Sequence, residues 1–312
     1  MRVAVLDIGS NTIKLLVATR SSTGGVNTVH YAVEEARLGS GLGATHPILA
    51  EPNMDRAVAA IGRLLALARS FAPAQTQLVA TSAVRDATNG AAFAARVLAA
   101  TGEPVRILTG KEEADYIGAG LAADPALAGT QDFYLFDLGG GSLECLEFRD
   151  RRATQSTSLR LGCVRLTERC VADPTAPFTA AQRNAVVAAV RDAVAGGAFR
   201  FALPSPAAAV ATGGTVTTVR AIISAEHGRS VAETGTTVGV EELEALLARI
   251  GPLTLAERRL VPGLPAARAD IFPTALATII EVARLAGLGR FTHSFYNLRY
   301  GIATEVLGAP GT

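Results

Sequence analysis

The sequence contains almost no lysine, only three cysteines and no long apolar run. Lysine occurs only at Lys14 and Lys111, so arginine supplies nearly all of the 29 basic side chains. Acidic side chains number 28, and the net charge of +1 gives no overall field that would draw nucleic acid or a membrane surface. Genomic base composition explains the arginine excess, which also provides planar donors suited to phosphate oxygens.

The cysteines and the apolar segments exclude further classes of protein. Cys145, Cys163 and Cys170 lack the close spacing of a zinc or redox motif, so we expect free thiols in a reducing cytoplasm. The uncharged stretch 201–219 is interrupted by two prolines and a glycine pair, whereas a membrane-spanning helix needs about 20 mostly apolar residues. The first apolar run ends at Asp7, which does not fit a signal peptide. We therefore expect a cytoplasmic protein without membrane or nucleic-acid partners.

Two segments of the same pattern occur far apart in the chain. An apolar strand leads through Asp7 into the turn Gly9-Ser10-Asn11-Thr12, and another leads through Asp137 into Gly139-Gly140-Gly141-Ser142. A second apolar stretch follows each turn. The separation far exceeds the 20 to 50 residues of a solenoid repeat. It predicts two similar domains, each opening with a β-hairpin.

Helices and strands alternate through the rest of the chain. Apolar residues at helical spacing predict helices over 53–71, 91–100, 112–121, 180–195, 216–224, 241–250, 271–288 and 297–307. Short apolar runs predict strands at 78–80, 105–108 and 207–211. This alternation is typical of α/β layers. Because a helix must stop before Pro125, we place the domains at 1–124 and 125–312, with the last helix free to pack back on the first domain.

Three glycine turns are candidates for binding phosphate through backbone N–H groups, because glycine lets the backbone approach an anion closely. Two are the hairpin turns, and the third, Gly213-Gly214-Thr215, lies between a strand and a helix whose N-terminus would favour an anion. Most such turns are only turns, but three in one chain are a rarer coincidence. None has the spacing of a dinucleotide fingerprint.

Several charged residues adjoin these turns. Asp137 and Glu144 lie across one predicted hairpin, where two carboxylates would suit Mg²⁺. Asp7 is either a metal ligand or only a cap of its own turn. Arg85 follows a buried strand in a polar loop, where it is either a solvated arginine or a phosphate clamp.

Glu112 and Glu113 open a predicted helix, and adjacent helical side chains diverge by roughly 100°. Glu112 suits the first turn of a helix, where acidic residues are favourable. Glu113 shares a helical face with Ile117, Gly120 and Leu121, which predicts that its side chain points inward. We therefore predict Glu113 rather than Glu112 as a reactive group.

These motifs, taken in order, resemble the exopolyphosphatase/guanosine pentaphosphate phosphohydrolase family. The resembling segments cover essentially the whole chain: Asp7–Thr12, Thr81–Asn89, Leu108–Ala114, Asp137–Glu144, Leu161–Glu168, Ala211–Thr215, Arg268–Asp270 and Ser294–Gly301. One departure is Leu143, where family members usually carry threonine. The chain also resembles the short, two-domain members rather than those with an appended helical domain.

The resemblance implies a fold and a set of roles. The fold is α/β, with two ribonuclease-H-like domains, as in actin, sugar kinases and heat-shock ATPases, flanking a cleft. Glu113 would be the general base, Arg85 would hold phosphate as a second catalytic residue, and Asp137 and Glu144 would bind or orient Mg²⁺. The three glycine turns would bind phosphate. A homodimer is expected from the same resemblance.

The expected activity is Mg²⁺-dependent release of terminal orthophosphate from inorganic polyphosphate, with short chains preferred because no appended domain would hold a long polyanion. Hydrolysis of guanosine pentaphosphate is the first alternative, since this substrate also ends in a phosphoanhydride. An actin-like sugar kinase or ATPase and a silent nucleotide-binding regulator are weaker alternatives. The segments around Arg85 and Glu113 argue against the kinase, and the intact carboxylates argue against the silent regulator.

Overall fold

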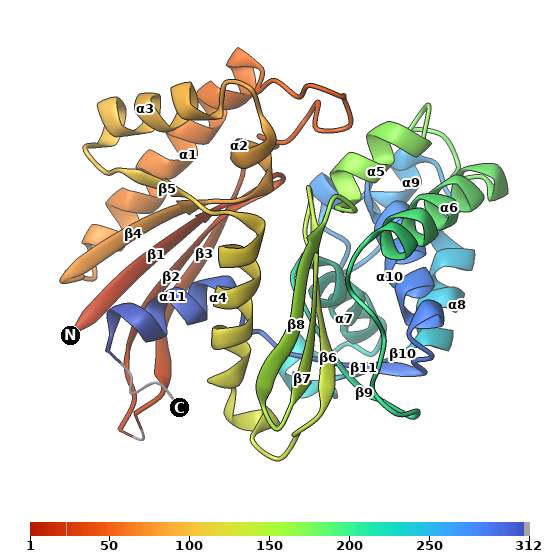
Figure 1. Ribbon diagram of the computed structural model, residues 1–312. Helices are drawn as coiled ribbons and strands as arrows, with labels where there is room; N and C mark the ends of the chain where they lie inside the picture. The colour runs from red at the N-terminus through yellow and green to blue at the C-terminus, as the bar shows by residue number, and fades with distance from the viewer. Residues whose placement is uncertain (23, 309–312) are drawn as a thin grey trace. The chain divides into compact units, whose positions relative to one another are not determined.

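The computed structural model describes residues 1–22 and 24–308, which form two compact units. The first comprises Met1–Ala128 and Tyr296–Thr312, and the second comprises Gly129–Phe295. The predicted boundary was placed four residues earlier, and the final helix, α11 (Leu298–Val306), belongs to the first unit. In Figure 1 this blue helix lies against α4 and the red strands, although it is far from them in sequence.

The first unit is built on a five-stranded sheet of order β3-β2-β1-β4-β5. The strands are β1 (Arg2–Ile8), β2 (Thr12–Arg20), β3 (Val26–Glu35), β4 (Gln75–Ala80) and β5 (Val105–Ile107). The first three strands pair antiparallel, whereas β1, β4 and β5 pair parallel. Polar residues therefore follow β4 and β5 at the same edge of the sheet, which is where Arg85 and Glu113 occur in the chain.

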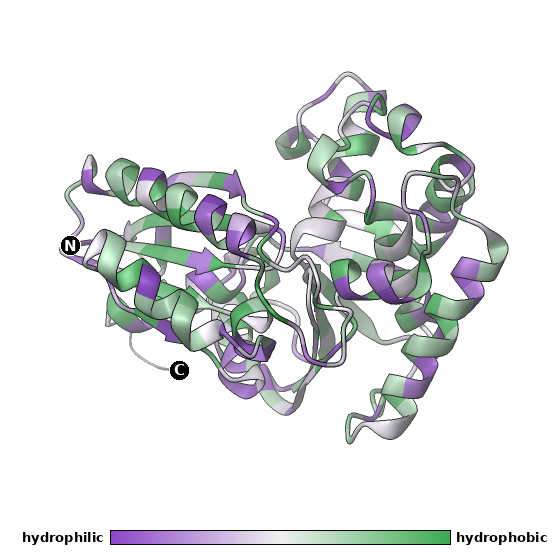
Figure 2. Cartoon of the chain, turned by 90° about the horizontal axis from the view of Figure 1, so that it is seen from above, coloured by the Kyte–Doolittle hydropathy of each residue, from purple (hydrophilic) through white to green (hydrophobic). Residues whose placement is uncertain are grey.

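Helices pack on both faces of this sheet, and its central strand β1 is buried at every position after Arg2. The helices are α1 (Glu51–Arg69), α2 (Ser82–Asp86), α3 (Gly90–Thr101), α4 (Gly110–Ala122) and α11. Ala4, Leu6 and Ile8 face the core formed with α1 and α3. The alternate residues Val3, Val5 and Asp7 therefore face the other side, where α11 contacts β1. Figure 2 shows the helices alternating between hydrophobic and hydrophilic colour, as expected for elements with one buried face.

Helices α4 and α11 cross with their backbones in contact. A Cβ atom added to Gly301 would lie 1.9 Å from the carbonyl oxygen of Tyr116, and one added to Gly120 would lie 2.1 Å from that of Asn297. Only glycine fits at such a crossing, because no side chain can occupy space already filled by backbone. The crossing fixes α11 against the helix that begins three residues before Glu113.

We expect Gly301→Ala to destabilise the protein, although alanine normally stabilises a helix interior by about 0.5–1 kcal/mol relative to glycine. The added methyl group must push α11 away from α4, and such overpacking typically costs about 1–3 kcal/mol. The free energy of unfolding in urea measures the difference. Gly62→Ala is the matched control, because Gly62 lies inside α1 with nothing within 4 Å of its added Cβ. A stabilising effect of both substitutions would contradict the close crossing.

The second unit is built on a six-stranded sheet of order β10-β11-β9-β6-β7-β8. The strands are β6 (Phe133–Leu138), β7 (Leu143–Arg149), β8 (Arg152–Leu159), β9 (Ala208–Thr212), β10 (Thr237–Gly239) and β11 (Arg290–His293). Strands β6, β7 and β8 pair antiparallel, and β6, β9 and β11 pair parallel. With β10 set aside, the order β8-β7-β6-β9-β11 repeats that of the first sheet. This is the ribonuclease-H-like topology, so the predicted fold class is confirmed.

The helices of the second unit form one large apolar core with its sheet. They are α5 (Cys163–Cys170), α6 (Ala180–Gly196), α7 (Gly214–Glu226), α8 (Val240–Ile250), α9 (Leu255–Arg258) and α10 (Phe272–Leu285). Leu143, the residue that departs from the family pattern, is fully buried in this core. None of the helices in the described part of the chain is both long and apolar enough to cross a membrane.

The structure adds elements that the sequence patterns did not predict. Strands β3 and β8 lie at sheet edges and carry mostly polar or half-exposed residues, so they lack the apolar run of a buried strand. Helix α5 was also missed. Arg85 lies in the short helix α2, and its assignment to a loop was wrong.

Candidate active site

The two hairpin turns are closed by equivalent backbone hydrogen bonds. The N–H of Gly9 donates to the carbonyl of Thr12 over 3.1 Å, and the N–H of Gly139 donates to that of Ser142 over 3.0 Å. Asp7 is paired in register with Lys14, and Asp137 is paired with Glu144. The repeat in the sequence is therefore a repeat in structure, but only the second hairpin pairs two carboxylates directly across its strands.

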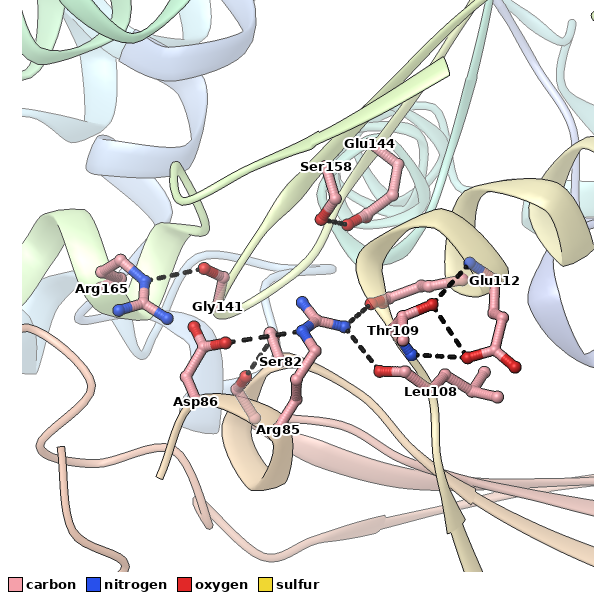
Figure 3. A network of polar contacts seen from close by, with 12 residues as sticks. Ser82, Arg85, Asp86, Leu108, Thr109, Glu112, Gly141, Glu144, Ser158 and Arg165 are labelled. Carbon is pink, nitrogen blue, oxygen red and sulfur yellow. Dashed lines mark hydrogen bonds and ion pairs between the residues drawn. The ribbon is translucent and has the colours of Figure 1, made fainter. Parts of the chain in front are cut away.

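Asp137 and Glu144 extend from the same face of the second sheet. Directly opposite residues of an antiparallel pair share a face, with their Cβ atoms about 4.5–5.5 Å apart. Glu144 is only 2% exposed, and its Oε1 accepts a hydrogen bond from the Ser158 hydroxyl over 2.7 Å (Figure 3). Asp137 is half-buried, and burying the charge of Glu144 beside it is favourable only with a compensating cation or hydrogen-bond donors. Oxygen-only donors of this kind suit Mg²⁺, so the predicted metal ligands fit that ion.

The third glycine turn lies directly against Asp137. Gly213 has φ +86° and ψ −178°, a conformation open essentially only to glycine, and a Cβ added to it would lie 2.2 Å from Asp137 Oδ1. A Cβ on Gly214 would lie 2.4 Å from Nη1 of Arg268. The hydroxyl of Thr215 is 3.4 Å from the carbonyl of Leu138. The turn 213–215 thus combines the N-terminus of α7 with a carboxylate and a guanidinium.

The turn 139–142 is supported from behind by helix α5. The N–H groups of Cys163 and Val164 donate to the carbonyls of Gly139 and Gly140, over 3.0 and 2.8 Å. Nε of Arg165, which is 2% exposed, donates to the carbonyl of Gly141 over 2.9 Å (Figure 3). These bonds orient the peptide groups of the turn.

The turn 9–12 is likewise held by the segment that follows β3. The carbonyl of Asn11 accepts hydrogen bonds from the N–H groups of Ala36 and Arg37, and the carbonyl of Ser10 accepts one from Gly39. The hydroxyls of Ser10 and Ser82 lie 3.4 Å apart. Ser82 begins α2, so this turn is linked to the helix that carries Arg85.

Asp7 forms a buried ion pair. Its Oδ2 accepts a hydrogen bond from Nη1 of Arg299, which lies on α11, over 3.2 Å. The Arg299 guanidinium also lies over the ring of Tyr31. The ion pair with Arg299 corresponds to neither of the predicted roles of Asp7, which were metal ligand and turn cap.

Glu113 and Arg85 are in direct contact. Nη1 of Arg85 donates to Oε2 of Glu113 over 2.6 Å. The same nitrogen donates to the carbonyl of Leu108 over 3.2 Å (Figure 3). The side chains of Glu113 and Arg85 are 8% and 20% exposed. Asp86 lies on the other side of the guanidinium, 3.5 Å from Nε. The pair holds the Glu113 carboxylate in one orientation at the N-terminal turn of α4.

Glu112 instead stabilises the N-terminus of α4. It completes a capping box with Thr109, which fixes the start of α4. Hydrogen bonds from the Thr109 N–H and, next, from the Arg106 guanidinium lower the pKa of Glu112 to about 2. A carboxylate with so low a pKa is a weak base. Glu113, by contrast, is buried with Ile117 and Leu121, so the predicted division of the two faces is confirmed.

The structure brings the predicted residues into two sets. The first unit joins Glu113 to Arg85 and the turn 9–12 to Ser82, and the second joins Asp137 to Glu144 and to the turn 213–215. Arg165, Arg268 and Arg299 were within the motifs that carried the family resemblance but had no assigned role.

Within the described ranges 1–22 and 24–308, no cluster of three or more His, Cys, Asp or Glu side chains would hold a metal ion. The cysteines are free, and burial raises the pKa of Cys145 and Cys163.

Comparison with known proteins gives a consistent result. A profile of the Ppx/GppA phosphatase family matches residues 16–309. Exopolyphosphatase 2 of Mycobacterium tuberculosis is 30% identical over 321 aligned positions, which cover 98% of this chain and 99% of that protein.

Solved structures share the fold over nearly the full length. An exopolyphosphatase from Cytophaga hutchinsonii matches 99% of this chain and 98% of its own with a TM-score of 0.86 at 23% identity. The Ppx-GppA enzyme of Aquifex aeolicus matches 98% of this chain and 99% of its own with a TM-score of 0.76 at 22% identity.

Proposed function

The chain belongs to the Ppx/GppA phosphatase family, and we propose that it is an exopolyphosphatase that releases terminal orthophosphate from inorganic polyphosphate. The observation that carries this proposal is the buried carboxylate of Glu113, held by Arg85 at the start of α4. The full-length similarity to Exopolyphosphatase 2 supports the choice of substrate.

Glu113 is assigned as the general base. It accepts a proton from water as the water oxygen bonds to the terminal phosphorus and the bridging P–O bond breaks. The leaving group is a polyphosphate shorter by one unit, and the other product is orthophosphate. Arg85 orients the Glu113 carboxylate, and as a guanidinium it is suited to binding phosphoryl oxygens.

Charge stabilisation is assigned to the glycine turns. Backbone N–H groups of the turns 139–142 and 213–215 are assigned to phosphate, as are those of the turn 9–12 in the first unit. Donors already in place where charge develops give a large part of phosphoryl-transfer catalysis. Asp137 and Glu144 would hold Mg²⁺, which when bound neutralises charge on phosphoryl oxygens. Arg268, beside Gly214, adds a fixed positive charge at the turn 213–215.

The direct test measures orthophosphate release from tripolyphosphate, long-chain polyphosphate and guanosine pentaphosphate under the same conditions, with and without Mg²⁺. We expect release from polyphosphate that requires Mg²⁺. Release from guanosine pentaphosphate alone would favour the nucleotide as substrate. Sedimentation of the same preparation tests the homodimer that the family resemblance suggests.

We also expect the 312-residue chain to hydrolyse short polyphosphate with a higher kcat/KM than chains of hundreds of units. The groups assigned above engage only the few phosphates nearest the chain end, and no group in this proposal is assigned to hold the remainder of a long chain. Activity should fall with added salt, because charges in water are screened over about 8 Å at physiological ionic strength. Processive degradation of long chains would contradict this expectation.

A further inference from the structure

A row of hydrogen-bonded side chains links the turn 213–215 to the end of β11. The hydroxyl of Thr217 lies 2.8 Å from the carbonyl oxygen of Gly213 and 3.1 Å from Nε2 of His293. Nδ1 of His293 lies 2.8 Å from Nη1 of Arg220. His293 and Arg220 are only 4% and 3% exposed. All four residues belong to the second unit.

Arg220 determines the direction of every bond in this row. A guanidinium only donates, so Nδ1 of His293 must accept. The proton of the neutral ring is then on Nε2, which donates to the Thr217 hydroxyl, and that hydroxyl donates to the Gly213 carbonyl. Burial and, next, the charge of Arg220 lower the pKa of His293 to about 4, so the ring is neutral at physiological pH.

Arg220 is itself held rigidly by the loop before β10. Nη2 donates to the carbonyls of Val231 and Thr234 over 2.6 and 3.0 Å, and Nε donates to that of Gly235 over 3.1 Å. Three carbonyls and one imidazole therefore fix the guanidinium. The Arg220 end of the row is therefore fixed, and at the other end the Thr217 hydroxyl contacts the Gly213 carbonyl of the glycine turn.

The Gly213 carbonyl controls the neighbouring N–H group. A trans peptide is planar, so the C=O of Gly213 and the N–H of Gly214 point in opposite directions. The backbone of α7 holds this carbonyl only through a long hydrogen bond, 3.4 Å from the Thr217 N–H, whereas the Thr217 hydroxyl lies at 2.8 Å. We propose that His293 is a positioning residue, which acts through Thr217 on the Gly213 carbonyl and so aims the Gly214 N–H at substrate phosphate. This inference rests on the proposed function, in which the turn 213–215 binds phosphate.

Binding of tripolyphosphate in the presence of Mg²⁺ tests the inference without turnover when each variant is made in the Glu113→Gln background. Thr217→Val and His293→Phe should each raise the Kd roughly five- to tenfold, as expected for loss of one net hydrogen bond. The double variant should bind about as weakly as either single one, because both act through one row. His293→Gln retains an amide donor and should restore binding to within about twofold.

Thr278→Val is the matched control. Its hydroxyl donates to the carbonyl of Thr274 over 2.8 Å, which is the same bond to the fourth preceding residue, but in α10. This variant should leave the Kd unchanged. If Thr217→Val and His293→Phe also leave it unchanged, or if their effects add, the positioning role is wrong. Failure of the proposed function is a separate outcome, in which the parent chain binds tripolyphosphate as described but releases no orthophosphate.

Discussion

Glu113→Gln is expected to lower kcat for polyphosphate by about 10²–10⁴-fold, the range typical for loss of a general base. Glutamine keeps the volume of the side chain and an oxygen that accepts the hydrogen bond from Arg85, so α2 and α4 should keep their positions. The KM for polyphosphate should change by only a few-fold, because phosphate is assigned to backbone, arginine and metal. Orthophosphate release and direct binding of tripolyphosphate measure the two effects separately.

Glu112→Gln is the matched control at the neighbouring position. Glutamine also completes a capping box, so α4 should still begin at Gly110. Turnover should stay within a few-fold of the parent. If Glu112→Gln is inactive and Glu113→Gln turns over normally, the two roles are reversed. If both variants are fully active, another group accepts the proton, and Asp137 is the next candidate.

Gly213→Ala is expected to lower kcat/KM by at least about 10²-fold. The added methyl group would lie 2.2 Å from Asp137 Oδ1, so the carboxylate must rotate away from the turn. A displacement of about 1 Å in a catalytic group can cost 10²-fold in rate. The Mg²⁺ concentration needed for half-maximal activity should rise as well, since Asp137 is an assigned metal ligand. Steady-state kinetics at several Mg²⁺ concentrations measure both changes.

Gly228→Ala is the control for a side chain placed at a positive φ without a close neighbour. Gly228 also has a positive φ, +63°, but nothing lies within 4 Å of its added Cβ. Alanine there should cost about 1–2 kcal/mol in stability, the usual penalty for a left-handed residue with a side chain. Its activity should match the parent. Near-normal activity of a folded Gly213→Ala variant would show that the position of the Asp137 carboxylate is unimportant.

No sequence pattern predicted the contacts between residues that are distant in the chain. Arg299 pairs with Asp7 across a sequence separation of 292 residues, and Arg220 meets His293 across 73. Neither partner has a local signal, because each polar group is satisfied by a residue that only the folded chain brings near. The same holds for Gly301 and Gly120, which read as ordinary helix glycines until α4 and α11 cross.

The sequence by itself determined the features that follow from local periodicity and turn chemistry. The alternation of apolar strands and helices predicted the α/β class, the two Asp-x-Gly turns predicted the paired hairpins, and helical spacing placed Glu113 inward and Glu112 outward. The tertiary structure decided which residues meet: Glu113 with Arg85, Asp137 with Gly213, and Thr217 with His293. It also decided that α11 belongs to the first unit. Periodicity and turn chemistry act within a few residues of the chain. These contacts depend instead on the order of the parallel strands within each sheet, which brings distant residues together.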